Sequence, residues 1–355
     1  MTEKPHGQSR TAICVIPERR VCPLAFSAAT KHSDRDVGEY IMLRILAGSM
    51  FLALTQIAGA DMGSEAAAFE HASAFLSPYR MIVGGFSAPA SPVPGQPPSG
   101  AYLKLFHPSA LTANGPDLYV VDSGQRLLLR IDTVSQSITP LREISPLPGV
   151  RIKAGIDGSV YVLRPDRGEV TRLTRDGRPI VTFSAKYEVL QPADIVIEPT
   201  LNRPWISDAA GGVFAFHPSG RKSEPLVGRG DGFPDELAGA TLLAANRVHV
   251  AGIDPRCRCI VDFDRDGYVI GKYGEGKLLN PSDIALDAHD RTWVIDRGDR
   301  SLKIFDHGEL VATLKPAQLG LVDLTAISID VYHAYIADAP SGRIGVFGVT
   351  PPSRR

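Results

Sequence analysis

Short apolar segments alternate with turn residues through most of the chain, and the same four-part order returns several times. Each unit opens with an apolar run such as Ile284-Ala285-Leu286, and a second run ends in aspartate, as in Trp293-Val294-Ile295-Asp296. An alternating segment such as Leu302-Lys303-Ile304-Phe305-Asp306 follows, and a fourth such as Leu310-Val311-Ala312-Thr313-Leu314 ends the unit. Alternation of apolar and polar positions is typical of half-buried strands. The pattern therefore predicts four short antiparallel strands per unit, which together make one propeller blade.

A recurrent aspartate gives the period of the repeat. It ends the second predicted strand at Asp122, Asp208, Asp254, Asp296 and Asp338. Asp254 to Asp296 and Asp296 to Asp338 are 42 residues each, and the 86 residues from Asp122 to Asp208 are two periods of 43. A period of about 40 to 50 residues with strand and turn content is typical of a β-propeller. Because the carboxylate recurs in the units, we expect it to cap a turn by accepting backbone N–H groups and not to catalyse.

The predicted fold class is all-β, a six-bladed β-propeller over residues 80–349. The sixth unit ends before a fourth strand, and an open strand edge invites aggregation. We therefore expect an N-terminal strand near residues 81–84 to close the ring, with residues 86–99 as a Pro-rich extended insert. The second and fourth units depart most from the pattern. The six units run over residues 107–147, 148–188, 189–232, 233–276, 277–320 and 321–349.

Residues 280–287, 293–298 and 302–306 resemble an NHL repeat, and so does the last unit, which contains Ile336-Ala337-Asp338 and Arg343-Ile344-Gly345-Val346-Phe347. The resemblance covers about residues 80–349 and implies a six-bladed propeller. The family includes protein-binding and RNA-binding modules, and related propellers include lyases and lactonases. Fold resemblance alone therefore leaves the function open.

Charge and motifs exclude several function classes. The chain of 355 residues has 38 Lys and Arg against 39 Asp and Glu, and no segment concentrates basic residues without interleaved acids. The basic patch expected of a nucleic-acid-binding protein is absent from the sequence, so we expect no nucleic-acid partner. The sequence contains no G-x-S-x-G, no H-E-x-x-H and no phosphate loop.

Residues 42–60 have the features of a secretory signal peptide: Arg44, an apolar run over 45–57 and an Ala58-Gly59-Ala60 cleavage site. Since such a signal begins at the initiator, we interpret residues 1–41 as a non-native extension and Met42 as the start. The expected location is the periplasm or the outside of the cell. The competing interpretation is an uncleaved membrane anchor with the propeller outside the cytoplasm, although the run is shorter than the roughly 20 residues of a spanning helix.

Two flanking segments receive separate predictions. Residues 61–79 are rich in alanine and form a short helix or stay disordered, and residues 350–355 are a disordered tail. A twin-arginine signal at Arg19-Arg20 is rejected, because the apolar stretch after it is broken by charged residues at 31–36.

The central channel is the expected place for chemistry. Asp194 and Asp283 begin the innermost strands of the third and fifth units, and Arg151 and Lys153 occupy that strand in the second. These four residues are the candidate ligand-binding set at the channel mouth, where the basic pair would form ion pairs with the carboxylates or bind an anion. The alternative is a Ca or Zn site on Asp194 and Asp283, but two carboxylates make a poor donor set.

Cys257 and Cys259 are the thiol pair of the predicted mature chain. Residues i and i+2 of a strand share a face at the limit of what a disulfide spans. Free thiols, a disulfide, and a metal site with His249 as a third ligand are the three interpretations.

The hypothesis for function is a non-catalytic, exported binding module for a protein or a small molecule, without a cofactor. Its expected binding face carries the aspartate turns and inter-blade loops such as 228–232 and 274–277. The rival is a metal-dependent lyase or lactonase-like hydrolase with its site at the central channel.

Overall fold

The structure, a computed structural model, is all-β in the residues that it describes. Strands are accompanied by two short 3₁₀ turns, η1 (Pro316–Leu319) and η2 (Ala339–Ser341). No helix in these residues has the length and apolar character needed to cross a membrane. The described residues are 74–87, 100–144, 149–185, 189, 191–225 and 240–351. Several segments with sequence-based expectations lie wholly or mostly outside these ranges: 1–41, 42–60, 61–79, 86–99, 228–232 and 350–355.

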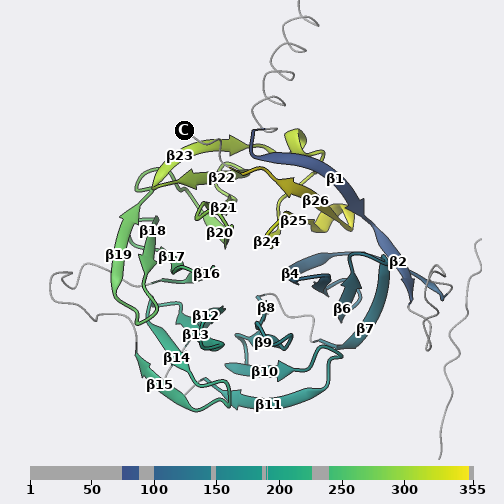
Figure 1. Ribbon diagram of the computed structural model, residues 1–355, viewed down its shortest axis with the longest axis horizontal. Helices are drawn as coiled ribbons and strands as arrows, with labels where there is room; N and C mark the ends of the chain where they lie inside the picture. The colour runs from purple at the N-terminus through teal and green to yellow at the C-terminus, as the bar shows by residue number, and fades with distance from the viewer. Residues whose placement is uncertain are drawn as a thin grey trace, which may run out of the picture. The chain divides into compact units, whose positions relative to one another are not determined.

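Six sheets stand around a common axis as the blades of a propeller (Figure 1). The innermost strands are β4 (Pro108–Asn114), β8 (Arg151–Ala154), β12 (Pro192–Glu198), β16 (Leu242–Ala245), β20 (Pro281–Leu286) and β24 (Ala326–Ile329). The second strands are β5 (Asp117–Asp122), β9 (Val160–Arg164), β13 (Arg203–Asp208), β17 (Val250–Asp254), β21 (Thr292–Asp296) and β25 (His333–Asp338). We number the blades 1 to 6 in this order.

The outer half of each blade completes the sheet. The third strands are β6 (Leu127–Asp132), β10 (Glu169–Leu173), β14 (Val213–Phe216), β18 (Cys259–Phe263), β22 (Ser301–Asp306) and β26 (Arg343–Val349). The outermost strands of blades 1 to 5 are β7 (Ser137–Glu143), β11 (Pro179–Ser184), β15 (Lys222–Pro225), β19 (Val269–Tyr273) and β23 (Glu309–Leu314). The six-bladed propeller predicted from the repeat is therefore confirmed, and the deviant second and fourth units each form a four-stranded sheet.

Burial is greatest in the second strands and falls toward the rim, and this explains the sequence pattern. All residues of β5, β17 and β21 are buried, because neighbouring blades cover both faces of a second strand. Trp205 and Trp293 lie in second strands and are fully buried. The outermost strand β19 alternates between half-buried and exposed residues, since only one of its faces packs on the blade interior.

The ring closes through an N-terminal strand, as expected, but the strand begins earlier than residue 81. β1 (Leu76–Ile82) pairs antiparallel with β26 and is the outermost strand of blade 6. The propeller thus includes residues that were assigned to the 61–79 segment, and Gly84 belongs to the next strand. Pro78 sits at a register shift of the β1–β26 pair. A proline inside a strand is tolerated only at edges and bulges, so its presence hid this strand in the sequence.

The chain crosses from blade 6 to blade 1 directly after the closing strand. β2 (Gly84–Ser87) pairs in parallel with β7 and antiparallel with β3 (Tyr102–Lys104), so blade 1 becomes a six-stranded sheet. Gly85 is required at this crossing, because an added Cβ would lie 2.5 Å from the Gln136 carbonyl oxygen. One continuous segment, β1 and β2, therefore pairs with both blade 6 and blade 1. We call the β1–β26 pairing that closes the ring the seam.

The closing strand predicts a difference between two substitutions in it. Leu76 is 2% exposed and packs in the core cluster with Leu314 and Phe347, whereas Met81 is 40% exposed. We expect Leu76→Ala to lower the free energy of unfolding by about 3 kcal/mol and Met81→Ala by no more than about 0.5 kcal/mol. Denaturant unfolding followed by circular dichroism measures both, and equal effects would contradict closure by β1.

Candidate functional site

The recurrent aspartates organise the loops at one end of the propeller. The Asp296 carboxylate accepts N–H hydrogen bonds from Gly298 in its own turn (2.9 Å) and from Leu279 and Asn280 before the innermost strand (2.7 and 2.8 Å). Lys303 Nζ lies 2.7 Å from the same carboxylate. Burial opposes ionisation of Asp296, but these donors outweigh it and hold its pKa below the usual value.

The other copies make related bonds. In each, a carboxylate oxygen accepts a backbone N–H from the following turn, from the segment before the innermost strand, or from both. The donors are His107 and Gln125 for Asp122, Gln191 and Ala210 for Asp208, Arg256 for Asp254, and Val322 and Asp323 for Asp338. These are the contacts of a structural carboxylate, and they reach further than the single turn expected from the sequence.

Arg151 crosses the axis of the propeller from blade 2 to the opposite blade 5. Its Nη2 donates to the Ser282 carbonyl oxygen at 3.4 Å, and its Nη1 lies 3.8 Å from Asp283 Oδ1. Its Nε lies 3.9 Å from Asp194 Oδ1 in blade 3. Burial disfavours the charged guanidinium, but the two carboxylates outweigh this and raise the pKa of Arg151. Arg151 is therefore a fixed positive charge between three blades.

Asp194 and Asp283 each join two neighbouring blades. Asp194 Oδ2 accepts the N–H of Leu243 in blade 4 at 2.9 Å, and Asp283 Oδ2 accepts the N–H of Ile327 in blade 6 at 2.8 Å. Their Oδ1 atoms accept the N–H groups of the residues that follow them, Ile195 and Ile284. All four carboxylate oxygens therefore have backbone donors.

These residues do not fit a metal site. The guanidinium of Arg151 lies against both carboxylates and takes the place that a cation would need. Burial raises the pKa of Asp283, although Lys153 and Arg151 act in the opposite direction, and a raised pKa weakens a carboxylate as a metal ligand. Asp194 and Asp283 are better described as two carboxylates beside Arg151 that each bind the main chain of a neighbouring blade. We call this role an inter-blade clasp.

A cavity of about 510 Å³ opens at the end of the propeller that carries the aspartate turns. We call it the mouth cavity. Blades 1, 2, 4, 5 and 6 contribute to its wall. The polar side chains that matter below are Arg151, Arg297, His107, Ser109, Thr241 and Ser282, and no carboxylate lines it among the described residues. The volume of the mouth cavity is within the range of small-molecule sites.

A second hollow of about 320 Å³ shares His107, Arg297 and Thr325 with the mouth cavity and adds Arg300 and Asp323.

The sequence identified one residue of this wall and missed the others. Arg151 lines the mouth cavity, whereas Lys153, Asp194 and Asp283 do not. Arg297 directly follows the recurrent Asp296, and Ser123 directly follows Asp122. The usable signal was therefore the unrepeated residue after the repeated aspartate. The 274–277 loop of the expected binding face does not line the cavity.

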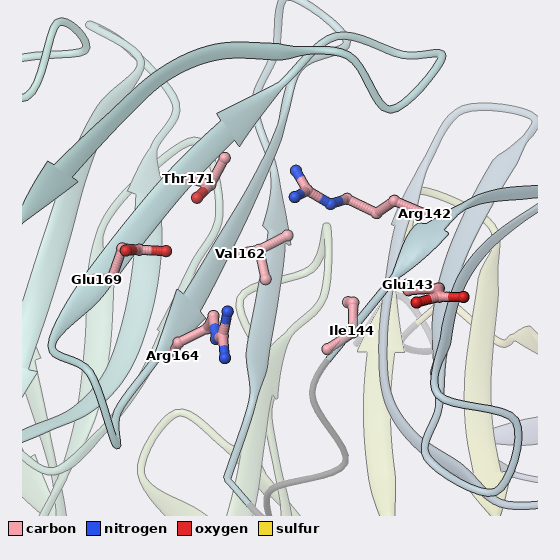
Figure 2. Close-up of a pocket in the computed structure, with 7 residues that line it drawn as sticks. All are labelled: Arg142, Glu143, Ile144, Val162, Arg164, Glu169 and Thr171. Atoms are coloured by element: carbon pink, nitrogen blue, oxygen red, sulfur yellow. The ribbon is translucent and has the colours of Figure 1, made fainter.

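A smaller pocket between blades 1 and 2 does not have the size of a ligand site. Figure 2 shows Arg164 and Glu169 on the neighbouring strands β9 and β10, with Arg142 and Glu143 of β7 across from them. The pocket encloses about 30 Å³, which is room for about one water molecule. Nε and Nη2 of Arg164 have no hydrogen-bond partner within the described ranges. We therefore exclude it as a site for an organic ligand.

Cys257 and Cys259 form a disulfide in the structure, with their Cα atoms 5.2 Å apart. Asp254 lies close to both sulfur atoms, whereas His249, the candidate ligand in the metal interpretation of this pair, is not part of the group. The ring nitrogens of His249 lie instead 3.5 Å from Asp262 and 3.3 Å from Asp290.

His249 joins blades 4 and 5 through these carboxylates. Asp262 also accepts the Tyr273 hydroxyl at 3.3 Å, and Asp290 accepts the Asn246 amide at 2.6 Å. Burial of the ring disfavours its charged form, but Asp262 and Asp290 outweigh burial and raise the pKa of His249. The protonated ring is therefore the form that this inter-blade contact favours.

Solved structures of other proteins match this chain at low sequence identity. A protein of unknown function from Bacteroides thetaiotaomicron is 13% identical, with 77% of each chain covered and a TM-score of 0.52. Virginiamycin B lyase from Staphylococcus aureus is 13% identical over 70% of this chain and 98% of its own, with a TM-score of 0.48. Hydrazine synthase from Kuenenia stuttgartiensis is 12% identical over 73% and 99%, with a TM-score of 0.49.

No family model matches the chain, and no curated protein matches its sequence. At 13% identity the likeness to the Bacteroides protein concerns the fold alone. The six sheets around one axis make the chain a six-bladed β-propeller.

The clasp role of Asp283 predicts a large loss of stability on truncation. Asp283→Ala leaves the Ile327 N–H without its acceptor and removes one of the two carboxylates beside Arg151. We expect the free energy of unfolding to fall by about 3 kcal/mol. Asp176→Ala is the matched control, because its ion pair with Arg130 is exposed and contributes at most about 1 kcal/mol. Similar losses for both variants in denaturant unfolding would contradict the clasp.

The raised pKa of His249 predicts a pH-dependent contribution to stability. A raised folded-state pKa stabilises the fold fully below the unfolded value of about 6.5, and the contribution is lost as pH rises through the folded pKa. We expect His249→Gln to lower the melting temperature at pH 5.5 and to match the unsubstituted protein progressively better toward pH 9. The exposed His217→Gln serves as the control. A constant gap over this range would show that His249 does not titrate against Asp262 and Asp290.

Proposed function

We propose that the chain is an exported NHL-type propeller that binds a small molecule in the mouth cavity without transforming it. The observation that carries the proposal is the assignment of the axial carboxylates. Asp194 and Asp283 hold backbone N–H groups of neighbouring blades and flank Arg151, while the cavity beside them is lined by hydroxyl and cationic groups. Such a wall supplies hydrogen bonds for recognition, and among the described residues no carboxylate lines it that could serve as general base.

Export is supported by the sequence alone. Residues 42–60 combine a basic start, an apolar run and a small-residue cleavage site. The location that we propose for the protein is the periplasm or the outside of the cell. The disulfide between Cys257 and Cys259 is compatible with an oxidising compartment. The NHL assignment rests on the repeat motif at residues 280–306 and on the blade that these residues form.

The binding role favours a small molecule over a protein partner. The mouth cavity is concave and about 510 Å³ in volume, whereas a protein interface usually covers a broad area of about 800 Å² per partner. A small ligand seated there would touch several blades at once.

The proposal predicts cavity-dependent retention of an unchanged ligand. We expect the protein, incubated with a bacterial metabolite extract and freed of unbound material, to retain a compound that mass spectrometry detects after denaturation. Ser109→Trp places an indole in the wall of the cavity and should abolish retention. Ser219→Trp, on the exposed turn between β14 and β15, should leave it intact.

Two outcomes would contradict the proposal. Retention that is equal in both tryptophan variants would place binding elsewhere, and time-dependent conversion of the retained compound would make the protein an enzyme. Chelation with EDTA distinguishes the metal-dependent lyase or lactonase, since we expect neither retention nor the melting temperature to change.

A further inference from the structure

We propose that the ligand of the mouth cavity is a polyhydroxylated organic anion, a sugar acid or a sugar phosphate. This inference rests on the proposed binding function and adds the chemical class of the ligand. It follows from which hydrogen-bonding groups of the cavity wall are already used inside the protein and which are left for a guest.

The floor of the cavity offers a guanidinium with unused donors. Arg151 carries five N–H donors, and in the described part of the chain its side chain makes one hydrogen bond, to the Ser282 carbonyl oxygen. Its Nε is buried without a hydrogen-bond partner there and lies 3.9 Å from Asp194, while Nη1 lies 3.8 Å from Asp283. The carboxylates therefore keep Arg151 charged without using up the donors of its two terminal nitrogens. Those terminal donors suit a carboxylate or phosphate of a guest.

The rim adds a second guanidinium. Arg297 is exposed, and its main chain is fixed by the N–H bond to the Asn280 carbonyl oxygen at 2.9 Å. No hydrogen bond or ion pair of its side chain is found in the ranges that the structure describes. Since no carboxylate lines the cavity in these ranges, the net charge of its lining is positive. A negative guest is therefore favoured over a neutral or cationic one.

The wall between floor and rim offers acceptors. The hydroxyls of Ser109, Thr241 and Ser282 each donate to a carbonyl of the adjacent second strand, those of Val121, Ile253 and Ile295, at 3.3, 3.3 and 3.4 Å. A hydroxyl that has donated its one proton retains its oxygen lone pairs. These three oxygens, in blades 1, 4 and 5, can therefore accept hydrogen bonds from donors on the guest.

His107 adds a fourth group of this kind. The Ser123 hydroxyl lies 3.1 Å from the His107 carbonyl oxygen and 2.9 Å from His107 Nδ1. In the tautomer in which Ser123 donates to the carbonyl and accepts from Nδ1, Nε2 of the neutral ring is an acceptor. Cationic donors at two ends and acceptors between them match a molecule that carries an anionic group and several hydroxyls. A simple inorganic anion would leave the wall unpaired.

The test measures affinity for a defined panel by isothermal titration calorimetry on the full chain at fixed ionic strength. The panel contains the hexuronates and the hexose 6-phosphates of glucose, galactose and mannose, with the three neutral hexoses, acetate and inorganic phosphate for comparison. We expect at least one anionic sugar to bind with a Kd at least tenfold below those of its neutral hexose and of the simple anion. Whether a hexuronate or a hexose phosphate binds tighter distinguishes carboxylate from phosphate.

Two substitutions locate the charge recognition. Arg297→Gln should weaken binding of the anionic sugar at least tenfold, and the double variant with Arg151→Gln should remove the preference for the anion over the neutral hexose. Arg221→Gln, exposed on the turn between β14 and β15, is the matched control and should leave the Kd unchanged. Because Arg297 is exposed, its variant keeps the fold even if the loss of Arg151 does not.

Three results would overturn the inference: no binding by any anionic sugar, equal binding of neutral hexoses, or binding unaffected by Arg297→Gln. The extract experiment separates this failure from that of the proposed function. If a neutral compound is retained and Ser109→Trp abolishes its retention, the ligand class is wrong and the binding function stands. If no compound is retained through the cavity, both are wrong.

Discussion

The antiparallel pairing of β1 with β26 is the constraint on which the rest of the structure depends. A ring of sheets has a stable outer rim only if each blade has four strands, and the C-terminal segment supplies three for blade 6. The N-terminal strand provides the fourth, and the residues after it continue into blade 1 as β2. The inner strands are thereby held around one axis, and the mouth cavity, built by five blades, exists only while the ring is closed.

The charged side chains near the axis of the ring hold neighbouring blades together. Asp194 and Asp283 bind main-chain N–H groups across blade boundaries, and Arg151 lies between them from the opposite side. Buried carboxylates and a buried guanidinium are stable only when each has partners, and here they are one another's partners. Arg151 lines the cavity, whereas the carboxylates of Asp194 and Asp283 do not. In the binding function that we propose, the same arginine would serve both recognition and structural support.

The sequence predicted the architecture much better than the site. The period of the aspartates and the apolar second strands reflect local rules of strand and turn formation, and those rules hold in each blade. Closure of the ring by an N-terminal strand was predicted correctly, but the strand was placed near residues 81–84 and begins at Leu76. Pro78 interrupts the strand pattern that Leu76 and Ile82 otherwise follow. Arg297 was missed because the residue after a repeated aspartate is not constant and arginine follows only one of the five copies, so no repeat marks it. Asp194 and Asp283 were recognised as axial, but which N–H groups they bind depends on neighbouring blades and is not encoded in any local motif.

The pairing of the first strand with the last has a consequence for how the chain is made. Ser77 and Gly348, which face each other across the seam, are 271 residues apart. A chain synthesised from its N-terminus presents β1 first and the partner of β1 last. Blades 1 to 5 can form as local units of four consecutive strands. The pairing of β1 with β26 can form only after β26 has been synthesised. Contacts of such long sequence separation form slowly. Until β26 has been synthesised, β1 lacks its partner strand, and unpaired strands expose a nascent chain to aggregation.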